Sequence, residues 1–437
     1  MGSYAECWFS SFYLGSTKGQ IDPSIIQLFR SSDKNKFTGT KSQIPLQSRH
    51  WLKHFDDNEE IDVVYYSAPV NVIRDRLNLD GYTLETARVV FLESIRKEIE
   101  KYEEWSQKKH REAFLEPLKF LKMIDVDIWL LALKKIYTEN LMPSRLTHQR
   151  KGYDGTLISY MLDNPNGWYG YPGLDLNVAL RLTLEILPEA DEFIYDVTDL
   201  IMGGYYSQDE DFVKLWAETR KTIILTEGSI DSWIISESLQ LLYPHLADYF
   251  TFMDFEGARV GGGTGSLANI VKAFSGTGIV NKVVAIFDND TAAATALRGL
   301  KFVQIPPNIK IIQLPEMDFL KNYPTLGPSG LVSMDVNGLA ASIELYLGKD
   351  ILVDASGNLI PIQWAGYIPE LSRYQGEIMS KEEIQKRFKQ KVSACKNNKE
   401  LLTKTDWGGM QAVLQSLFTV FHELDKVEIL SMIDEYS

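Results

Sequence analysis

The strongest constraint on the fold is the order of elements after Thr222, where short apolar runs alternate with helical runs. Strands are expected at residues 223–226, 250–255, 283–287 and 309–314, and helices at 232–242, 267–274 and 292–302. This alternation with short connections is typical of a parallel sheet covered by helices on both faces. Because the crossovers are right-handed, the carboxyl ends of all strands should meet at one edge.

The whole chain is longer than one hydrophobic core usually supports, since it has 437 residues. We expect a small N-terminal α/β domain at residues 1–80, a helical segment at 81–215, the parallel-sheet domain at 216–350 and a helical C-terminal tail at 351–437. Apolar residues at helical spacing from Thr83, and again from Arg111 to Leu141, indicate the helical segment.

Composition bounds the class of protein. Hydrophobic residues make up 45% and charged residues 24%, as in ordinary soluble domains, and no signal peptide or membrane-spanning run is recognisable. Two cysteines, Cys7 and Cys395, suit a reducing compartment, so a cytoplasmic location without membrane contact is expected. The net charge of −14 argues against a general DNA-coating surface, but a local carboxylate site neutralised by metal remains compatible with nucleic-acid chemistry.

Two acidic clusters directly follow buried strands of the expected sheet. Glu227 and Asp231 come after the first strand, and Asp288 and Asp290 after the third. Ligands bind at the carboxyl edge of such sheets, where these groups would repel one another unless a cation neutralised them. Oxygen ligands select hard ions, so Mg²⁺ or Mn²⁺ is the expected cofactor, and such ions support phosphodiester cleavage. The plainer alternative is that Asp290 is a helix N-cap.

The two clusters resemble a known pair of motifs. Glu227-Gly-Ser-Ile-Asp231 and Phe287-Asp288-Asn-Asp290-Thr-Ala-Ala are similar to the two defining motifs of the Toprim domain, shared by bacterial primases, topoisomerases and OLD-family nucleases. The resemblance covers roughly residues 220–320 and implies a Rossmann-like parallel sheet. It also implies that Glu227, Asp288 and Asp290 are catalytic and that these three, with Asp231, bind the metal.

The N-terminal sequence carries a second resemblance. Residues 1–8, Asp22-Pro23 and residues 28–30 resemble the domain that precedes Toprim in HEPN/Toprim proteins of bacterial conflict systems. Arg49 and His54 have the spacing of the HEPN ribonuclease motif, but they precede the long helices. We therefore interpret His54 as an exposed loop histidine and do not count this pair as catalytic.

The glycine-rich run at residues 261–266 supports a rival interpretation. Gly263 and Gly265 could contact substrate phosphate, and the run also fits a dinucleotide fingerprint with Asp288 as the ribose-binding acid. Residues 256–260 separate the glycines from the preceding strand, however, whereas the fingerprint needs the first glycine at the turn itself. We favour a loop beside the metal site.

Further acidic and basic residues near the expected site also have ordinary structural explanations. Asp254 and Glu256 could supply another ligand but fit a solvated turn equally well, and Glu344, in a helical-looking segment at 340–345, resembles a late acidic position of nuclease-type Toprim domains. The basic stretch from Lys386 to Lys399 could follow a phosphate backbone, although such a run is usually a solvated helix face.

The sequence as a whole favours a metal-dependent nuclease that cleaves DNA or RNA, with a role as an antiphage defence effector. The alternatives are a dinucleotide-binding sensor that uses the loop at 261–265, and an inert Toprim scaffold. No P-loop ATPase motif is present, so a separately encoded ATPase or sensor subunit is the expected partner besides nucleic acid, and homo-oligomerisation is left open.

Overall fold

The computed structural model describes residues 2–44, 51–52, 55–106, 112–143, 155–163, 168–213, 221–258 and 261–435. The chain forms two compact units. Unit 1 comprises Met1–Glu218 together with His422–Ser437, and unit 2 comprises Thr219–Phe421. The four domains expected from the sequence stay a prediction; within unit 1, strands distant in the chain pair in one sheet.

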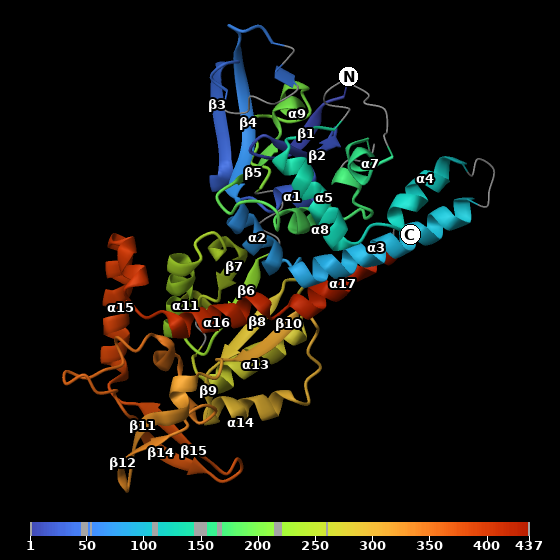
Figure 1. Ribbon diagram of the computed structural model, residues 1–437. Coiled ribbons are helices and arrows are strands. Elements are labelled where there is room, and N and C mark those ends of the chain that lie inside the picture. Colours follow the sequence, from blue (N-terminus) through green and yellow to red (C-terminus); the bar gives the residue numbers. More distant parts are fainter. Residues whose placement is uncertain are drawn as a thin grey trace. The chain divides into compact units, whose positions relative to one another are not determined.

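Unit 1 is built on an antiparallel sheet of order β2-β1-β5-β4-β3 (Figure 1). Its strands are β1 (Tyr4–Phe9), β2 (Phe12–Lys18), β3 (Lys34–Thr40), β4 (Glu60–Pro69) and β5 (Glu192–Asp196). Strand β5 pairs with β1 on one side and β4 on the other. The first 80 residues therefore complete their sheet with a strand from the segment expected to be helical.

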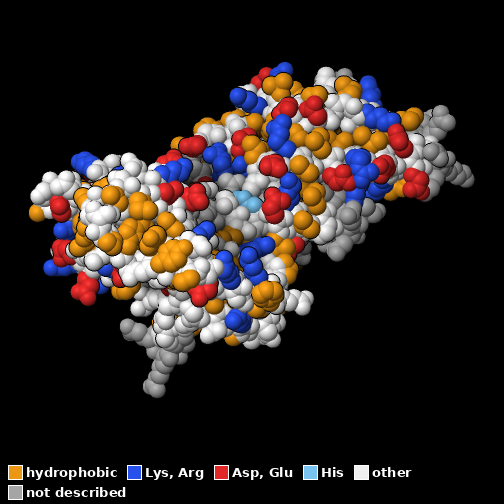
Figure 2. All heavy atoms as spheres, turned by 90° about the horizontal axis from the view of Figure 1, so that it is seen from below, with side chains coloured by type: hydrophobic (Ala, Val, Ile, Leu, Met, Phe, Trp, Pro, Cys, Tyr) orange, Lys and Arg blue, Asp and Glu red, His pale blue; other side chains and the backbone are white. Residues whose placement is uncertain are grey.

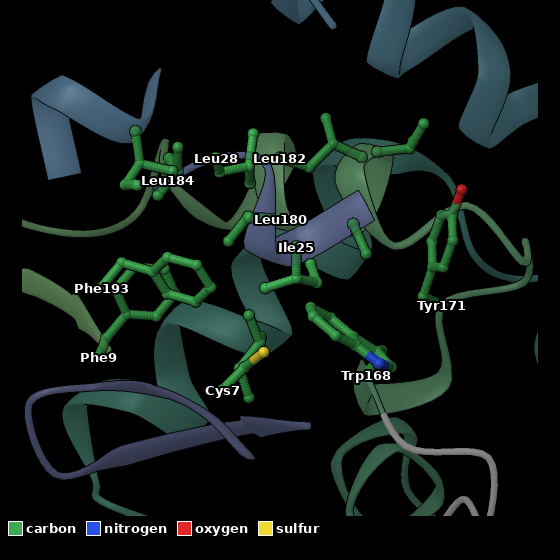
Figure 3. Close-up of a cluster of buried hydrophobic side chains, with 14 of the residues drawn as sticks. Cys7, Phe9, Ile25, Leu28, Trp168, Tyr171, Leu180, Leu182, Leu184 and Phe193 are labelled. Carbon is green, nitrogen blue, oxygen red and sulfur yellow. The ribbon is translucent and has the colours of Figure 1, made fainter. Parts of the chain in front are cut away.

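Helices surround this sheet and enclose a large aromatic core. They are α1 (Pro23–Ile26), α2 (Val70–Leu79), α3 (Leu84–Ser106), α4 (Glu112–Leu121), α5 (Val126–Thr138), α7 (Leu157–Asp163), α8 (Leu176–Thr183), α9 (Thr198–Met202) and α17 (His422–Glu435), with 3₁₀ turns η1 (Ser31–Asp33) and η3 (Trp168–Gly170). Figure 3 shows Phe9 and Phe193 side by side in the core, and their ring centroids lie 5.0 Å apart. The Phe29 ring stacks on Phe193 at 5.6 Å.

Unit 2 contains the expected parallel sheet, of order β10-β8-β6-β7. Its strands are β6 (Thr222–Leu225), β7 (Phe250–Phe252), β8 (Val283–Phe287) and β10 (Ile309–Gln313). They are linked by α11 (Ser229–Leu242), η4 (Ala247–Tyr249), α12 (Phe255–Ala258), α13 (Thr264–Ser275) and α14 (Thr291–Leu300). Helices α13 and α14 pack together, whereas α11 packs against α15 (Lys381–Asn397) and α16 (Gly408–Thr419) (Figure 1). The mixed α/β fold class predicted from the sequence is confirmed.

A second sheet of unit 2 departs from the sequence prediction. Its order is β12-β11-β14-β15, with β11 (Tyr323–Gly327), β12 (Gly330–Met334), β14 (Ile362–Ile368) and β15 (Arg373–Ile378). Two of these strands lie in the tail expected to be helical from residue 351, because a turn at Ser372, with positive φ, lets the segment fold back as a hairpin. Helices begin at Lys381.

The segment around Glu344 is also not the helix that its sequence suggests. It forms β13 (Ala340–Ala341), which pairs with β9 (Asn289–Asp290), and then the 3₁₀ turn η6 (Ile343–Tyr346). Two further 3₁₀ turns are η5 (Asp318–Asn322) and η7 (Lys399–Thr403). None of the helices in the described residues has the length and apolar character needed to cross a membrane.

Candidate metal centre

The acidic clusters lie at the point where the strand order of the parallel sheet reverses. Strands β6 and β8 are neighbours although β7 lies between them in sequence, so the chain leaves their carboxyl ends in opposite directions. Glu227 follows β6, and Asp231 lies in the first turn of α11. Asp288 follows β8, and Asp290 ends the short strand β9. In open parallel sheets this switch point is the usual place for a ligand.

Glu227 is held from two directions. Its Oε2 accepts a hydrogen bond of 2.6 Å from the Thr264 hydroxyl, and its Oε1 accepts one of 3.1 Å from the Asp288 backbone N–H. The Gly263 N–H donates to the Glu227 backbone carbonyl at 2.7 Å. The glycine-rich loop therefore packs against Glu227 and fixes its orientation.

Asp288 lies among the other acids of this group. Its Oδ1 accepts a hydrogen bond of 3.1 Å from the Ile343 backbone N–H, so η6 approaches it directly. Burial raises the pKa of Asp288 well above its ordinary value, and the nearby charges of Glu227, Asp231, Asp290 and Glu344 raise it further. Asp288 thus faces several like charges in a place with little water.

Asp231 and Asp290 experience the same environment. Burial, followed by the charge of Glu344, raises the pKa of Asp231 to about 7, although Lys381 opposes the shift. The pKa of Asp290 is raised chiefly by burial. Asp290 Oδ1 also accepts a 2.7 Å hydrogen bond from Ala293 N–H, so it is the N-cap of α14 as well as a member of the acidic group.

Glu344 and Lys381 belong to the same group of charged side chains as the four acids. The Glu344 side chain is fully buried and its Oε1 lies 3.3 Å from Lys381 Nζ. Gln385 donates to the same oxygen at 2.8 Å, and Ser342 donates to Oε2 at 2.7 Å. Burial lowers the pKa of Lys381, but Glu344, Asp288 and Asp231 outweigh it and the net shift is upward. Lys381 therefore stays positively charged among carboxylates.

The carboxylate oxygens of this group suit a hard cation, although they do not lie close enough together to coordinate one. Within the part of the chain that the structure describes, no three Asp, Glu, His or Cys side chains converge closely enough to surround an ion. The oxygen-only chemistry of Glu227, Asp231, Asp288 and Asp290 nevertheless fits Mg²⁺ or Mn²⁺. Their mutual repulsion at Asp288 is the condition that a divalent cation relieves.

The glycine-rich loop does not have the geometry of a dinucleotide fingerprint. Helix α12 stands between β7 and the glycines, so the first glycine is not at the strand's turn. Gly263 has a φ of 99° and directs its N–H to the Glu227 carbonyl, where it cannot also bind phosphate. A Cβ added at Gly265 would meet open space, so a role in contacting phosphate stays a prediction for that residue.

A comparison with protein-family models identifies the family of the N-terminal half of the chain. The model described as HEPN/Toprim N-terminal domain 1 matches residues 1–220, half of the 437 residues. The chain belongs to this HEPN/Toprim family. No curated protein and no solved structure matches it.

The HEPN/Toprim match and the acidic group occupy different parts of the chain. The matched region ends at residue 220, before Glu227, and corresponds closely to the N-terminal segment of unit 1. The parallel sheet of unit 2 is consistent with the Toprim-like fold that the family description includes. Arg49 and His54, the residues with HEPN spacing, lie outside the described residues.

Sequence reasoning missed Lys381, Gln385 and Ser342. Nothing in their spacing connects them to the acidic motifs, because η6 reaches the site through the pairing of β13 with β9, and α15 through its contacts with η6. Glu344 was noted for its resemblance to a late acidic position, and its complete burial marks it as part of the group. Asp254, by contrast, accepts a 3.0 Å hydrogen bond from Gly257 N–H, as expected for a turn.

The basic stretch on α15 makes contacts within unit 2 rather than forming an open phosphate track. Lys391 is buried and donates to the Leu347 carbonyl, Lys396 pairs with Glu237 at 2.5 Å, and Lys389 lies over the Trp233 ring. These contacts favour the structural interpretation of this stretch.

Proposed function

We propose that this HEPN/Toprim protein is a metal-dependent nuclease that cleaves phosphodiester bonds of DNA or RNA. The observation that carries the proposal is Asp288 at the sheet's switch point, facing Glu227, Asp231, Asp290 and Glu344. Burying like charges together costs stability. A bound divalent cation offsets that cost and supplies electrostatic stabilisation of a reacting phosphate.

The chain's own residues divide the work as follows. Glu227, Asp288 and Asp290, with Asp231, hold the cation. Thr264 and the Asp288 N–H orient Glu227, and the Ile343 N–H orients Asp288. Lys381, which carries its charge beside Glu344, stabilises negative charge that develops on the phosphate. The role of an antiphage defence effector, with a separately encoded ATPase or sensor, rests on the family resemblance and is part of the same proposal.

A cleavage assay tests the proposal. Purified protein is incubated with supercoiled plasmid, single-stranded DNA and transfer RNA in Mg²⁺, Mn²⁺ or EDTA. Cleavage of at least one substrate is expected with metal and not with EDTA. Asp288→Asn should lower the rate on the order of a thousandfold, because several kcal/mol of metal-dependent stabilisation depend on this charge.

The matched control is Asp318→Asn, which removes a carboxylate of unit 2 that is 96% exposed and pairs with Lys321. It should cleave at the wild-type rate. Cleavage that persists in EDTA, or that Asp288→Asn leaves unchanged, contradicts the proposal.

A further inference from the structure

The hairpin of β14 and β15 displays aromatic side chains on its surface. Tyr367 is 52% exposed and Tyr374 51% exposed, although tyrosine rings usually bury most of their area. Their ring centroids lie 5.1 Å apart, and the Trp364 ring lies 5.9 Å from that of Tyr374. We call Trp364, Tyr367 and Tyr374 the aromatic platform. Figure 2 looks from the end at which this sheet lies in Figure 1, and hydrophobic side chains gather on the surface there.

Strand register puts the three rings on one face. Tyr367 is directly opposite Tyr374, and Trp364 is opposite Gly376. A Cβ at Gly376 would lie 2.9 Å from Trp364 Cε3, and one at Gly327 of β11 would lie 3.5 Å from its Cδ1. Glycines beneath the indole thus let it lie close to the sheet. The Tyr367 and Tyr374 rings meet at 63° and the Trp364 and Tyr374 rings at 53°, so each ring presents its own face.

The platform is joined to the candidate metal centre by a side-chain hydrogen bond and by the packing of neighbouring strands. The Tyr374 carbonyl accepts a 2.7 Å hydrogen bond from the hydroxyl of Thr291, the first residue of α14. The residue before Thr291 is Asp290, and β13, which packs against β15, pairs with Asp290 and its neighbour. The position of the rings relative to the acidic group is therefore fixed within unit 2.

Two exposed arginines lie at the turn end of the same hairpin. Arg373 points to the face opposite Tyr374 and donates to the Gly338 carbonyl at 3.2 Å. A Cβ at Gly338 would lie 3.6 Å from Arg373 Nη1 and 3.8 Å from Asn289 Oδ1, so this guanidinium flanks the segment between Asp288 and Asp290. Arg298 donates to the Glu370 carbonyl at 2.8 Å. Each guanidinium has five N–H donors, which leaves capacity for phosphate oxygens.

We infer that the aromatic platform stacks on unpaired bases of the substrate, with Arg298 contacting an adjoining phosphate. Arg373 lies on the opposite face of the hairpin, beside Asn289. The inference rests on the proposed nuclease function and specifies its substrate as single-stranded or locally unpaired nucleic acid. Ring faces beside cationic groups are the features that bind single strands without reading sequence. Their fixed link to Asp290 favours nucleic acid over a protein occupant.

Binding measured apart from cleavage tests the inference. Fluorescence anisotropy compares a labelled single-stranded oligonucleotide with its blunt duplex in EDTA, which blocks metal-dependent cleavage. Wild-type protein should prefer the single strand. The double variant Tyr367→Ala/Tyr374→Ala should weaken single-strand binding roughly 5- to 150-fold, as expected for the loss of one stacked base, and duplex binding much less.

Two further double variants separate stacking from general hydrophobic contact. Phenylalanine at both tyrosine positions keeps the ring faces and should retain binding. Leucine at both positions keeps apolar area without a ring and should bind as weakly as alanine. The matched control is Leu331→Ala on β12, which removes a side chain that is 66% exposed on the same sheet. It should bind like wild type.

Several outcomes overturn the inference. These are a wild-type protein without single-strand preference, leucine variants that bind normally, or alanine variants that change the oligomeric state in size-exclusion chromatography but leave oligonucleotide affinity intact. The last result would assign the platform to contact between copies of the chain. Failure of the nuclease proposal is recognised separately, because cleavage retained by Asp288→Asn leaves the binding measurements unaffected.

Discussion

Two groups of buried charges, one in each unit, are arranged in opposite ways. In unit 1 the Arg76 side chain is 3% exposed and lies 2.6 Å from Asp33, and the buried Arg181 pairs with Glu185 at 2.5 Å. In unit 2 the acids Asp231 and Asp288 have raised pKa values because burial and neighbouring carboxylates disfavour their charged forms. Pairing supports a fold, whereas gathered like charges oppose it. The free-energy cost of gathering these carboxylates in unit 2 therefore indicates a ligand-binding role rather than a structural one.

The largest expected effect is that an Asp→Asn substitution lowers the free energy of unfolding in unit 1 but not in unit 2. Asp33→Asn removes the charge that lies 2.6 Å from the buried Arg76 guanidinium, and should lower the free energy of unfolding by about 3 kcal/mol. Asp231→Asn removes one of several repelling carboxylates, and should leave stability unchanged or raise it in EDTA. Urea unfolding at pH 8 measures both, and a similar loss in the two variants would remove the contrast.

The pH dependence of stability sharpens the comparison next. The folded-state pKa of Asp231 is about 7, above the value near 4 expected in the unfolded chain. The folded state therefore binds the proton more tightly. The stabilisation is fully present below about pH 4 and is lost as the pH rises through about 7.

Thermal unfolding in EDTA should consequently give a Tm that falls as the pH rises from about 5 to 8, with a smaller fall in Asp231→Asn. Mn²⁺ should raise the Tm more at pH 8 than at pH 5, because protons compete with the ion for the carboxylates. A Tm that does not respond to millimolar Mn²⁺ at pH 8 would argue against a metal site.

A smaller effect is expected at Lys381, which is the cation in contact with Glu344. Lys381→Met keeps the side-chain length but withdraws the charge, and should lower stability in EDTA by about 1–2 kcal/mol, a figure reduced because the lysine is partly exposed. The control Lys321→Met removes a lysine paired with the exposed Asp318 and should lower stability much less, because solvent screens this pair. Equal losses would mean that Lys381 is an ordinary surface cation.

The smallest expected effect concerns the loop that packs on Glu227. A Cβ at Gly262 would lie 3.0 Å from the Glu227 carbonyl oxygen, whereas one at Gly265 meets no atom within 4 Å. Gly262→Ala should therefore displace Glu227 slightly and reduce cleavage several-fold, since small displacements of catalytic groups are costly. Gly265→Ala should cleave like wild type. A reversed order of the two variants would give the loop a direct role in substrate binding.

The sequence predicted one sheet well and missed another for a physical reason. Strand β8 is buried along its whole length and is a continuous apolar run that can be recognised without tertiary information. Strands β6 and β10 are only partly buried, but their isoleucines still mark them as strands. The β14–β15 hairpin mixes polar and aromatic residues around Gly366 and Gly376, and it has no clean alternation to recognise. Strand β5 was also missed, because its partners β1 and β4 lie more than a hundred residues earlier.

The candidate site was partly accessible from sequence. Glu227, Asp231, Asp288 and Asp290 follow recognisable strands, so strand order was enough to bring them to one edge. Lys381 depends on the path of the second sheet, which sets where α15 begins. Whether the four acids bind a metal stays a prediction.

Unit 1 is completed by α17, which packs on α3 and forms a 2.8 Å ion pair between Lys426 and Glu85. During translation the ribosome makes all of unit 2 before it makes this helix. The parallel sheet that carries the acidic residues can therefore fold while unit 1 still lacks α17. A nascent chain that stops short of residue 422 would carry the candidate site while unit 1 lacks α17.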